Sequence, residues 1–302
     1  MNILSDHTFL TVAAGSAALG MISGVIGSFA VLRKQSLLGD GVSHAALPGV
    51  AAAFLITGVK SSGVLLLGAL LSGLLAALLI SVIVKYSKVK FDAALAAVMS
   101  GFFGLGTVLL TCAQKLPNAA QSGLSTFIYG QASAMLTSDV VLISVLSAVL
   151  LILTLLFWKE FKLFCFDRDF AVQSGFSEKK LSLLLSFMTV VTVILGIQTV
   201  GVVLMSAMLI IPAAAARQWS DRLYVNIMLA AFFGGFSGVF GALISGLGEG
   251  APTGPVIVIT ASVIAALSLL FAPKRGIVNK ILQRKISRLR LTVTVKGGNR
   301  KP

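Results

Sequence analysis

Asp40 and His44 are the two side chains of this sequence whose types and spacing most directly suggest chemistry. They stand four residues apart in the segment 37–50, LLGDGVSHAALPGV, which is otherwise apolar. Residues i and i+4 of a helix lie on the same face, so a carboxylate and an imidazole would point the same way. Both groups are good ligands for manganese, zinc and ferrous iron. The pair therefore indicates a metal site or a metal pathway.

A simpler interpretation gives the same two residues structural roles. Asp40 would cap the start of a helix, and His44 would be a packing residue with its hydrogen bonds satisfied. Burying a carboxylate in a membrane is costly, however, so ionisable side chains inside spans mostly face a partner, a cavity or a pathway. The presence of two such groups on one face favours the pathway.

The composition predicts an all-α polytopic membrane protein. The 302 residues are 57% hydrophobic and 11% charged, and the mean hydropathy is +1.00, which leaves too little polar surface for a soluble globule. The net charge of +14 does not indicate a nucleic-acid partner, because the basic residues lie between apolar runs and not on one folded face. Cys112 and Cys165 fall on opposite sides of the membrane, so no disulfide framework is expected.

Apolar runs of membrane-spanning length predict about nine transmembrane helices. The expected spans are residues 9–32, 37–57, 62–84, 92–113, 138–158, 180–197, 199–216, 223–247 and 254–273. Only Gln198 and Thr199 mark the boundary between the sixth and the seventh span, so eight or ten spans stay open as alternatives. The segment 124–136 is too short and too polar to span, and it is expected to form a re-entrant or interfacial helix on the side opposite the basic loops.

The basic residues predict the orientation. With nine spans, every lysine and arginine except Lys60 and Lys115 falls on one side of the membrane. The positive-inside rule places that side in the cytoplasm, which leaves the N-terminus outside and the C-terminus inside. We expect residues 1–273 to form the transmembrane domain, and residues 274–302 to form a basic cytoplasmic tail that lies on anionic membrane lipid.

Two glycine pairs predict close contacts between helices. Gly20 and Gly24 have the GxxxG spacing, and so do Gly234 and Gly238. Small residues at this spacing let the backbones of two membrane helices approach closely. We therefore interpret both pairs as packing positions.

The connection 159–180, KEFKLFCFDRDFAVQSGFSEKK, differs from an ordinary loop. It combines charged residues with five phenylalanines, so it is amphipathic and is expected to fold. Because these apolar rings need a surface to cover them, we expect the segment to dock against a cytoplasmic partner.

Common enzymatic motifs do not occur in the sequence. It contains no GxxxxGK[ST] nucleotide-binding loop, and no HExxH, GxSxG or CxxC. Asp92 and Asp139 stand at span ends, where helix capping explains them, so a membrane protease with an aspartate dyad is disfavoured. The chain is more typical of a transport pathway than of an enzyme.

Four ordered motifs resemble one family, the membrane permease subunits of binding-protein-dependent ABC importers for zinc, manganese and ferrous iron. The first is GVIGSFAVLRKQSLLGDGVSHAALPGVAAAFL at residues 24–55. The others are FDRDFAVQSGF at 166–176, LGIQTVGVVLMSAMLIIPAAAAR at 195–217 and PTGPVIVI at 252–259. The resemblance thus extends over nearly the whole chain.

The resemblance implies a transporter of several subunits in the bacterial cytoplasmic (inner) membrane. A second permease, either a copy of this chain or a homologue, would pair with it, and a cytoplasmic ABC ATPase dimer would hydrolyse ATP. An extracytoplasmic metal-binding lipoprotein would deliver the ion. This chain would then be a transport subunit and not an enzyme, with no permanently bound cofactor and a divalent metal ion as its cargo.

The resemblance also assigns roles to single residues. Asp40 and His44 match the pathway residues that coordinate the passing ion, with one pair from each permease. Asp169, Ala171 and Gly175 match positions of a cytoplasmic coupling helix that sits in a groove of the ATPase. Glu249, in an outer loop, and the length of the basic tail have no counterpart in this pattern.

Three other classes of transport protein stay open as alternatives. A permease for a metal chelate, such as a siderophore or cobalamin, would share the architecture but would have little use for Asp40 and His44. An ion-coupled secondary transporter would need no ATPase and should show an inverted repeat. A channel would need no cytoplasmic docking segment. Manganese, zinc and ferrous iron share these ligands, so the choice of metal stays open as well.

Overall fold

The computed structural model describes residues 7–59, 61–115, 130, 132, 135–247 and 251–279. Within these ranges the chain forms α1 (His7–Leu32), α2 (Leu38–Thr57), α3 (Ser62–Tyr86), α4 (Phe91–Gln114), α6 (Thr137–Leu156), α7 (Trp158–Phe166), α8 (Arg168–Gln173), α9 (Glu178–Val200), α10 (Val202–Trp219), α11 (Leu223–Leu247) and α12 (Thr253–Phe271). Eight of these helices are long and apolar enough to cross a membrane. The all-helical membrane architecture predicted from composition is therefore confirmed. Most of the predicted re-entrant helix at 124–136, the loop with Glu249 and the tail from residue 280 lie outside the described residues.

The sixth and seventh predicted spans are separate helices, α9 and α10, but the break between them is at Gly201 and not at Gln198 and Thr199. Gly201 has a φ of 89°, a region that glycine enters without the steric cost other residues meet. Thr199 continues α9 because its hydroxyl donates to the carbonyl of Gly196 at 2.9 Å, inside the helix. Its polar group is therefore satisfied without a break. α10 has 18 residues and is shorter than each of the eight spanning candidates.

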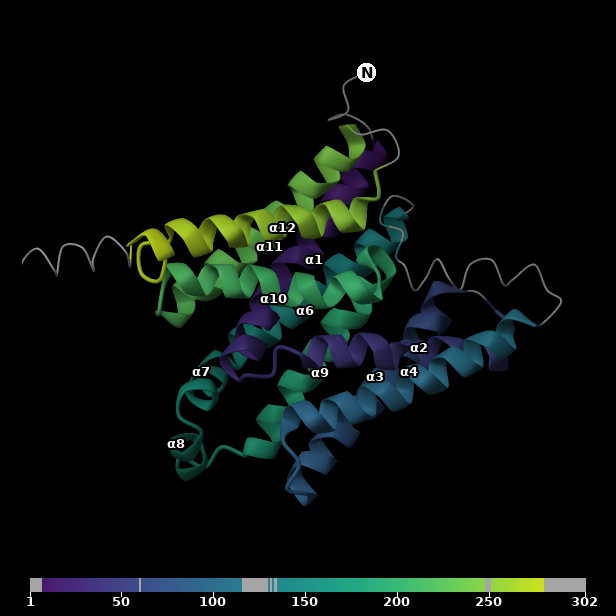
Figure 1. Cartoon of the computed structure of the whole chain (residues 1–302), viewed down its shortest axis with the longest axis horizontal. Helices are drawn as coiled ribbons and strands as arrows, with labels where there is room; N and C mark the ends of the chain where they lie inside the picture. Colours follow the sequence, from purple (N-terminus) through teal and green to yellow (C-terminus); the bar gives the residue numbers. More distant parts are fainter. Residues whose placement is uncertain are drawn as a thin grey trace, which may run out of the picture.

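The helices form two groups that meet at α9 (Figure 1). α2, α3 and α4 pack together on one side, while α1, α10, α11 and α12 pack together on the other. α1, α2 and α9 are buried over most of their lengths, whereas α3, α4, α6 and α12 are largely exposed. The exposed faces carry apolar residues such as Leu71 and Leu75 of α3, as expected of helices that face lipid.

The two glycine pairs predicted from sequence lie in one close contact, between α1 and α11. A Cβ atom on Gly20 would lie 2.1 Å from the carbonyl oxygen of Gly234, and one on Gly24 would lie 2.2 Å from that of Ala230. A Cβ on Gly238 would lie 2.4 Å from the carbonyl oxygen of Ser16. The two GxxxG pairs are thus confirmed as packing positions, and they face each other.

A second close contact joins α2 to α3. A Cβ on Gly49 would lie 2.1 Å from the carbonyl oxygen of Gly68, so the two backbones touch. Pro48 has no N–H, which removes the helical donor of the His44 carbonyl. One residue further on, the Ser72 hydroxyl of α3 donates to the carbonyl of Ala45 at 2.6 Å. We call this contact, formed by Ala45, Gly49, Gly68 and Ser72, the α2–α3 seam.

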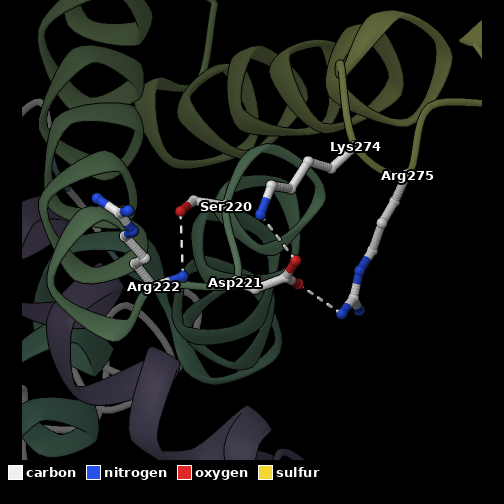
Figure 2. A network of polar contacts seen from close by, with 5 residues as sticks. All are labelled: Ser220, Asp221, Arg222, Lys274 and Arg275. Atoms are coloured by element: carbon white, nitrogen blue, oxygen red, sulfur yellow. Dashed lines mark hydrogen bonds and ion pairs between the residues drawn. The ribbon is translucent and has the colours of Figure 1, made fainter.

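Several basic segments meet at one end of the bundle, which we call the basic end. The Arg33 guanidinium, just after α1, donates to the Ser182 hydroxyl of α9 at 2.9 Å and lies 4.7 Å from the ring centroid of Phe164 of α7. Asp221, in the α10–α11 turn, pairs with Lys274 and Arg275 after α12 (Figure 2). These contacts connect the ends of α1, α7, α10 and α12 and the start of α9. Residues from the ends of α1, α7 and α10 and from the segment after α12 also line one cavity.

Candidate metal-binding site and coupling helix

A tight turn positions the start of α2, where Asp40 and His44 lie. Lys34 takes a left-handed conformation with φ of 57°, and the Gln35 N–H donates to the carbonyl of Ala30 at 2.9 Å. This pattern closes the end of α1 and reverses the chain. Asp40 then falls in the first turn of α2, and His44 lies one turn further on.

The structure brings the two predicted ligands together on one face of α2. The His44 Nε2 lies 3.7 Å from the Asp40 Oδ1, and the two side chains are 24% and 36% exposed, respectively. This separation is too long for a hydrogen bond. Within the described ranges, no other ion pair or hydrogen bond engages the Asp40 carboxylate, and the N-cap of α2 is Leu37, without a side-chain cap. The geometry therefore disfavours the interpretation of Asp40 as a capping residue.

The donor atoms fit a transition metal. Oxygen and nitrogen ligands lie about 2.0 to 2.2 Å from a zinc ion, so two ligands of one ion can be up to about 4.2 Å apart. The two side chains could therefore bind one ion without a change of backbone. On the side of α4, the Phe103 ring packs edge-on against the imidazole, with ring centroids 5.3 Å apart and planes at 89°. This contact limits the orientation of the His44 ring.

The pair provides only two of the ligands that a metal ion would need. Among the described residues, no three histidine, cysteine, aspartate or glutamate side chains lie close enough together to hold an ion. Zinc sites in proteins have four ligands, and other divalent ions take more. If an ion binds here, its remaining ligands would come from water, from backbone oxygens, from residues outside the described ranges or from another chain.

The predicted coupling segment folds into α7 and α8. The Asp167 carboxylate caps α8 by accepting from the Phe170 N–H at 2.9 Å. At the other end, Gly175 has a φ of 88°, and the Phe176 N–H donates to the carbonyl of Ala171 at 3.1 Å. This is a Schellman motif, in which glycine ends a helix through a left-handed conformation. Gly175 therefore has a definite local role.

The five phenylalanines of this segment divide into two sets. Phe161 and Phe164 are buried in the bundle, where Phe161 packs against Phe29 of α1 with ring centroids 5.6 Å apart. Phe166, Phe170 and Phe176 stay on the surface, at 59%, 53% and 37% exposure. Phe161 and Phe164 are covered within the chain itself, so the predicted docking against a partner stays a prediction for the second set only.

Of the three coupling residues, Ala171 is buried, Asp169 is exposed in the first turn of α8 and Gly175 follows its end. Sequence reasoning did not single out Phe103, Ser72 or Asp221. A single aromatic, serine or aspartate at a helix surface carries no spacing signal, and only the packing of distant segments shows its partner.

Comparisons with known proteins agree with this architecture. The model of the ABC 3 transport family matches residues 5–272. A zinc transport system membrane protein, TroC of Treponema pallidum, is 48% identical over 94% of this chain and 96% of its own length. A manganese transport system membrane protein, MntC of Bacillus subtilis, is 48% identical over 92% of this chain and 64% of its own length.

Solved structures show the same fold. PsaBC from Streptococcus pneumoniae, solved with a Fab, has a chain that superimposes with a TM-score of 0.80 at 31% identity, covering 94% of this chain and 97% of that one. A transporter titled as a putative metal-chelate type, in an inward-facing conformation, superimposes with a TM-score of 0.66 at 16% identity, covering 87% of this chain and 84% of that one, and supports the fold alone. With a family match over most of its length and relatives 48% identical, this chain belongs to the ABC 3 transport family.

Proposed function

We propose that this chain is the permease subunit of an ABC importer that moves manganese, zinc or ferrous iron into a bacterium. The observation that carries the proposal is the Asp40–His44 pair, two metal-competent side chains 3.7 Å apart and half-exposed within an apolar helical bundle. Membership of the ABC 3 transport family and relatives named for zinc and manganese transport support it.

The chemistry of the pair suits transport better than storage. A carboxylate oxygen and an imidazole nitrogen bind all three metals, while among the described residues no cysteine joins the pair to trap a soft ion. Two protein ligands from one chain bind an ion more weakly than a closed site of four. A matching pair from a second permease, either a copy of this chain or a homologue, would complete the sphere on the pathway and allow release.

Two rival functions fit the structure less well. A chelate permease would present a wide pathway to an organic ligand and would gain nothing from Asp40 and His44 side by side. An ion-coupled secondary transporter would need no exposed Phe170 and Phe176 around a cytoplasmic helix. An ABC permease for a bare metal ion would use both features.

We also propose that α8 is the coupling helix. Asp169 and Ala171 lie on this short capped helix and Gly175 follows its end, while the rings of Phe166, Phe170 and Phe176 in the same segment are exposed. A groove on an ABC ATPase dimer would cover these rings. ATP hydrolysis would then take place on that partner and not on this chain.

The orientation follows from the basic end. The positive-inside rule assigns the end that carries Arg33, Arg217 and Arg275 to the cytoplasm of the cell. The opposite end would then receive the metal from an extracytoplasmic lipoprotein. Residues 1–273 would form the membrane domain, and the basic tail at 274–302 would lie on anionic lipid.

Cellular metal content tests the transport proposal. We expect cells that lack this chain to lose one of manganese, zinc or iron selectively under metal limitation, as measured by elemental mass spectrometry. Wild-type protein should restore that metal, while Asp40→Asn and His44→Ala should not, because each removes one ligand. Asp92→Asn, which alters an exposed aspartate of α4, serves as the matched control and should restore uptake. Unchanged levels of all three metals would exclude the importer.

Substitutions at Gly175 test coupling. Valine there is strained, because the backbone has a φ of 88°, whereas asparagine tolerates this conformation. We expect Gly175→Val to lower metal-stimulated ATP hydrolysis in the assembled transporter by about tenfold or more, which corresponds to about 1.4 kcal/mol. Gly175→Asn keeps the left-handed backbone at the helix end but adds a side chain. A defect in both variants would therefore indicate that the partner needs a surface without a side chain, and a defect in Gly175→Val alone would indicate that it needs the backbone conformation. Normal transport by an assembled Gly175→Val complex would refute the coupling role.

A further inference from the structure

The basic end contains a cavity that neither metal binding nor coupling uses. It has a volume of about 120 Å³ and is lined by residues from the ends of α1, α7 and α10, the start of α11 and the segment after α12: Leu32, Phe166, Arg217, Ser220, Asp221, Leu223, Asn226 and Arg275. A second cavity beside Arg33 has only about 10 Å³, close to the minimum for one water molecule. The larger cavity has room for a small chemical group.

The lining of this cavity carries a positive charge that is not fully paired. Arg275 forms an ion pair with Asp221 at 2.7 Å, and Lys274 binds the other oxygen of the same carboxylate at 3.0 Å. Arg217, by contrast, is partly buried at the last turn of α10 and has no ion pair or hydrogen bond among the described residues. A guanidinium recognises the paired oxygens of phosphate or carboxylate groups.

Asn226 adds a second, independent indication of a ligand. The residue is 5% exposed, it lines the cavity, and its Oδ1 has no hydrogen-bond partner among the described residues. Buried polar atoms nearly always find a partner. The open position beside Asn226 therefore fits a hydroxyl or ammonium donor on the same ligand whose anionic part meets Arg217.

The surroundings place the cavity at the level of lipid head groups. Trp158 and Tyr224 pack edge to face with ring centroids 6.3 Å apart, and Trp219, at the end of α10, is 38% exposed. Tryptophan and tyrosine concentrate where a membrane meets water. Basic pockets between spanning helices on the cytoplasmic side bind the head groups of anionic lipids.

We propose that this cavity binds the phosphate group of an anionic phospholipid whose head group carries a hydroxyl, as in phosphatidylglycerol. Arg217 and Arg275 hold the phosphate oxygens, and Asn226 accepts a hydrogen bond from the head-group hydroxyl. The side chains of residues 280–302 include basic groups and no carboxylate, so none of these side chains supplies an anion for this cavity. The proposal concerns a site apart from Asp40 and His44 and does not depend on transport.

The test measures thermal unfolding of the full-length chain in detergent micelles titrated with phosphatidylglycerol, phosphatidylcholine or inorganic phosphate. We expect phosphatidylglycerol to raise the unfolding midpoint at lower concentration than phosphatidylcholine does. Arg217→Gln should weaken this effect by about tenfold or more, because it removes a charge-assisted contact. Arg222→Gln is the matched control. It removes the same charge from the neighbouring turn, and its side chain is exposed and points away from Lys274 and Arg275 (Figure 2).

Each outcome decides the proposal. Loss of the lipid effect in Arg217→Gln with retention in Arg222→Gln supports the site. Equal losses in both variants would mean that the lipid responds to surface charge alone, and no stabilisation by phosphatidylglycerol in the wild type would leave the site without a ligand; either result overturns the proposal. Protection by inorganic phosphate equal to that by phosphatidylglycerol overturns the lipid assignment. If Arg217→Gln does not fold, Arg217→Lys takes its place, because lysine keeps the charge but cannot make the two-pronged contact of a guanidinium. A weaker lipid effect in Arg217→Lys would support the site, and an unchanged effect would overturn it.

Discussion

Asp40 and His44 place a carboxylate and an imidazole on one face of α2, next to the ring of Phe103 from α4. The i, i+4 spacing predicted that both side chains share one face, and the structure shows them 3.7 Å apart. The edge-on contact of Phe103 with His44 could not be predicted, because it joins α2 to a helix more than 50 residues away. The ligand types are thus evident in the sequence, while the support of the imidazole depends on tertiary packing.

Asp221 leads to a prediction about pH. The hydrogen bond from Lys274, followed by the charges of Lys274 and Arg275, holds the pKa of the Asp221 carboxyl below its usual value. A lowered pKa in the folded state stabilises the protein above the unfolded pKa, which is about 3.9, and this contribution is lost as the pH falls through the folded value. We expect Asp221→Asn to unfold at a lower temperature than wild type at pH 7, and the difference to shrink below about pH 4.

Thermal unfolding of both proteins across this pH range checks the prediction. Asp92→Asn is the control, because Asp92 has no ion pair within the described ranges, and it should show no comparable pH-dependent difference. A difference in unfolding temperature between wild type and Asp221→Asn that stays constant from pH 7 to about 3.5 would contradict an electrostatic origin.

At the scale of helices, the α1–α11 contact offers a direct test of close packing. A methyl group on Gly20 would lie 2.1 Å from the carbonyl oxygen of Gly234, whereas one on Gly101 of α4 would meet nothing within 4 Å. We expect Gly20→Ala to destabilise the protein by about 1 to 3 kcal/mol through overpacking, as measured by thermal unfolding in micelles. Gly101→Ala should be neutral or slightly stabilising, since alanine is the better helix former. Equal effects of the two substitutions would show that the contact is looser than described.

Helices were predictable to different degrees. Long apolar runs bounded by charges predicted the spanning helices because backbone groups in lipid must bond within their own segment. The α9–α10 boundary was misplaced by a few residues, because Thr199 looks like a break in hydropathy although its hydroxyl bonds within the helix. α8 was predicted from its resemblance to a coupling helix, and its end at Gly175 follows from glycine at a left-handed position.

The whole molecule makes a prediction about topology. In a chain with Cys112 and Cys165 replaced by alanine, a membrane-impermeant maleimide should label Ser61→Cys from outside intact cells. The same reagent should not label Lys88→Cys, because the α3–α4 turn is expected to face the cytoplasm. Permeabilised cells provide the control, in which both positions should react. Labelling of Lys88→Cys from outside would reverse the proposed orientation.

Of the two native cysteines, Cys112 is the one whose replacement matters most for this labelling experiment. It is exposed, whereas Cys165 is partly buried, and burial raises the pKa of the Cys165 thiol to about 11. Maleimides react with the thiolate, so in the chain with its native cysteines Cys165 should react slowly even in permeabilised cells.

For the molecule as a whole, the sequence predicted the class and, within the described residues, the number of spanning helices to within one. It could not predict the cavity at the basic end, which is built from Leu32, Phe166, Arg217, Asn226 and Arg275. These residues are up to 243 positions apart in the chain, and each alone is an ordinary interfacial residue. Only the folded arrangement shows that they share one space.

The α2–α3 seam also bears on how the permease can work. Backbone atoms of Gly49 and Gly68 leave no space for even a methyl group, and Ser72 ties α3 to the turn of α2 next to His44. From Ala45 onward, α2 is therefore expected to move together with α3, because separating the two helices would break both contacts. We expect α2 and α3 to rotate together against α9, so that the face with Asp40 and His44 is exposed to one membrane surface and then to the other. The distance between Asp40 and His44 should stay the same during this rotation.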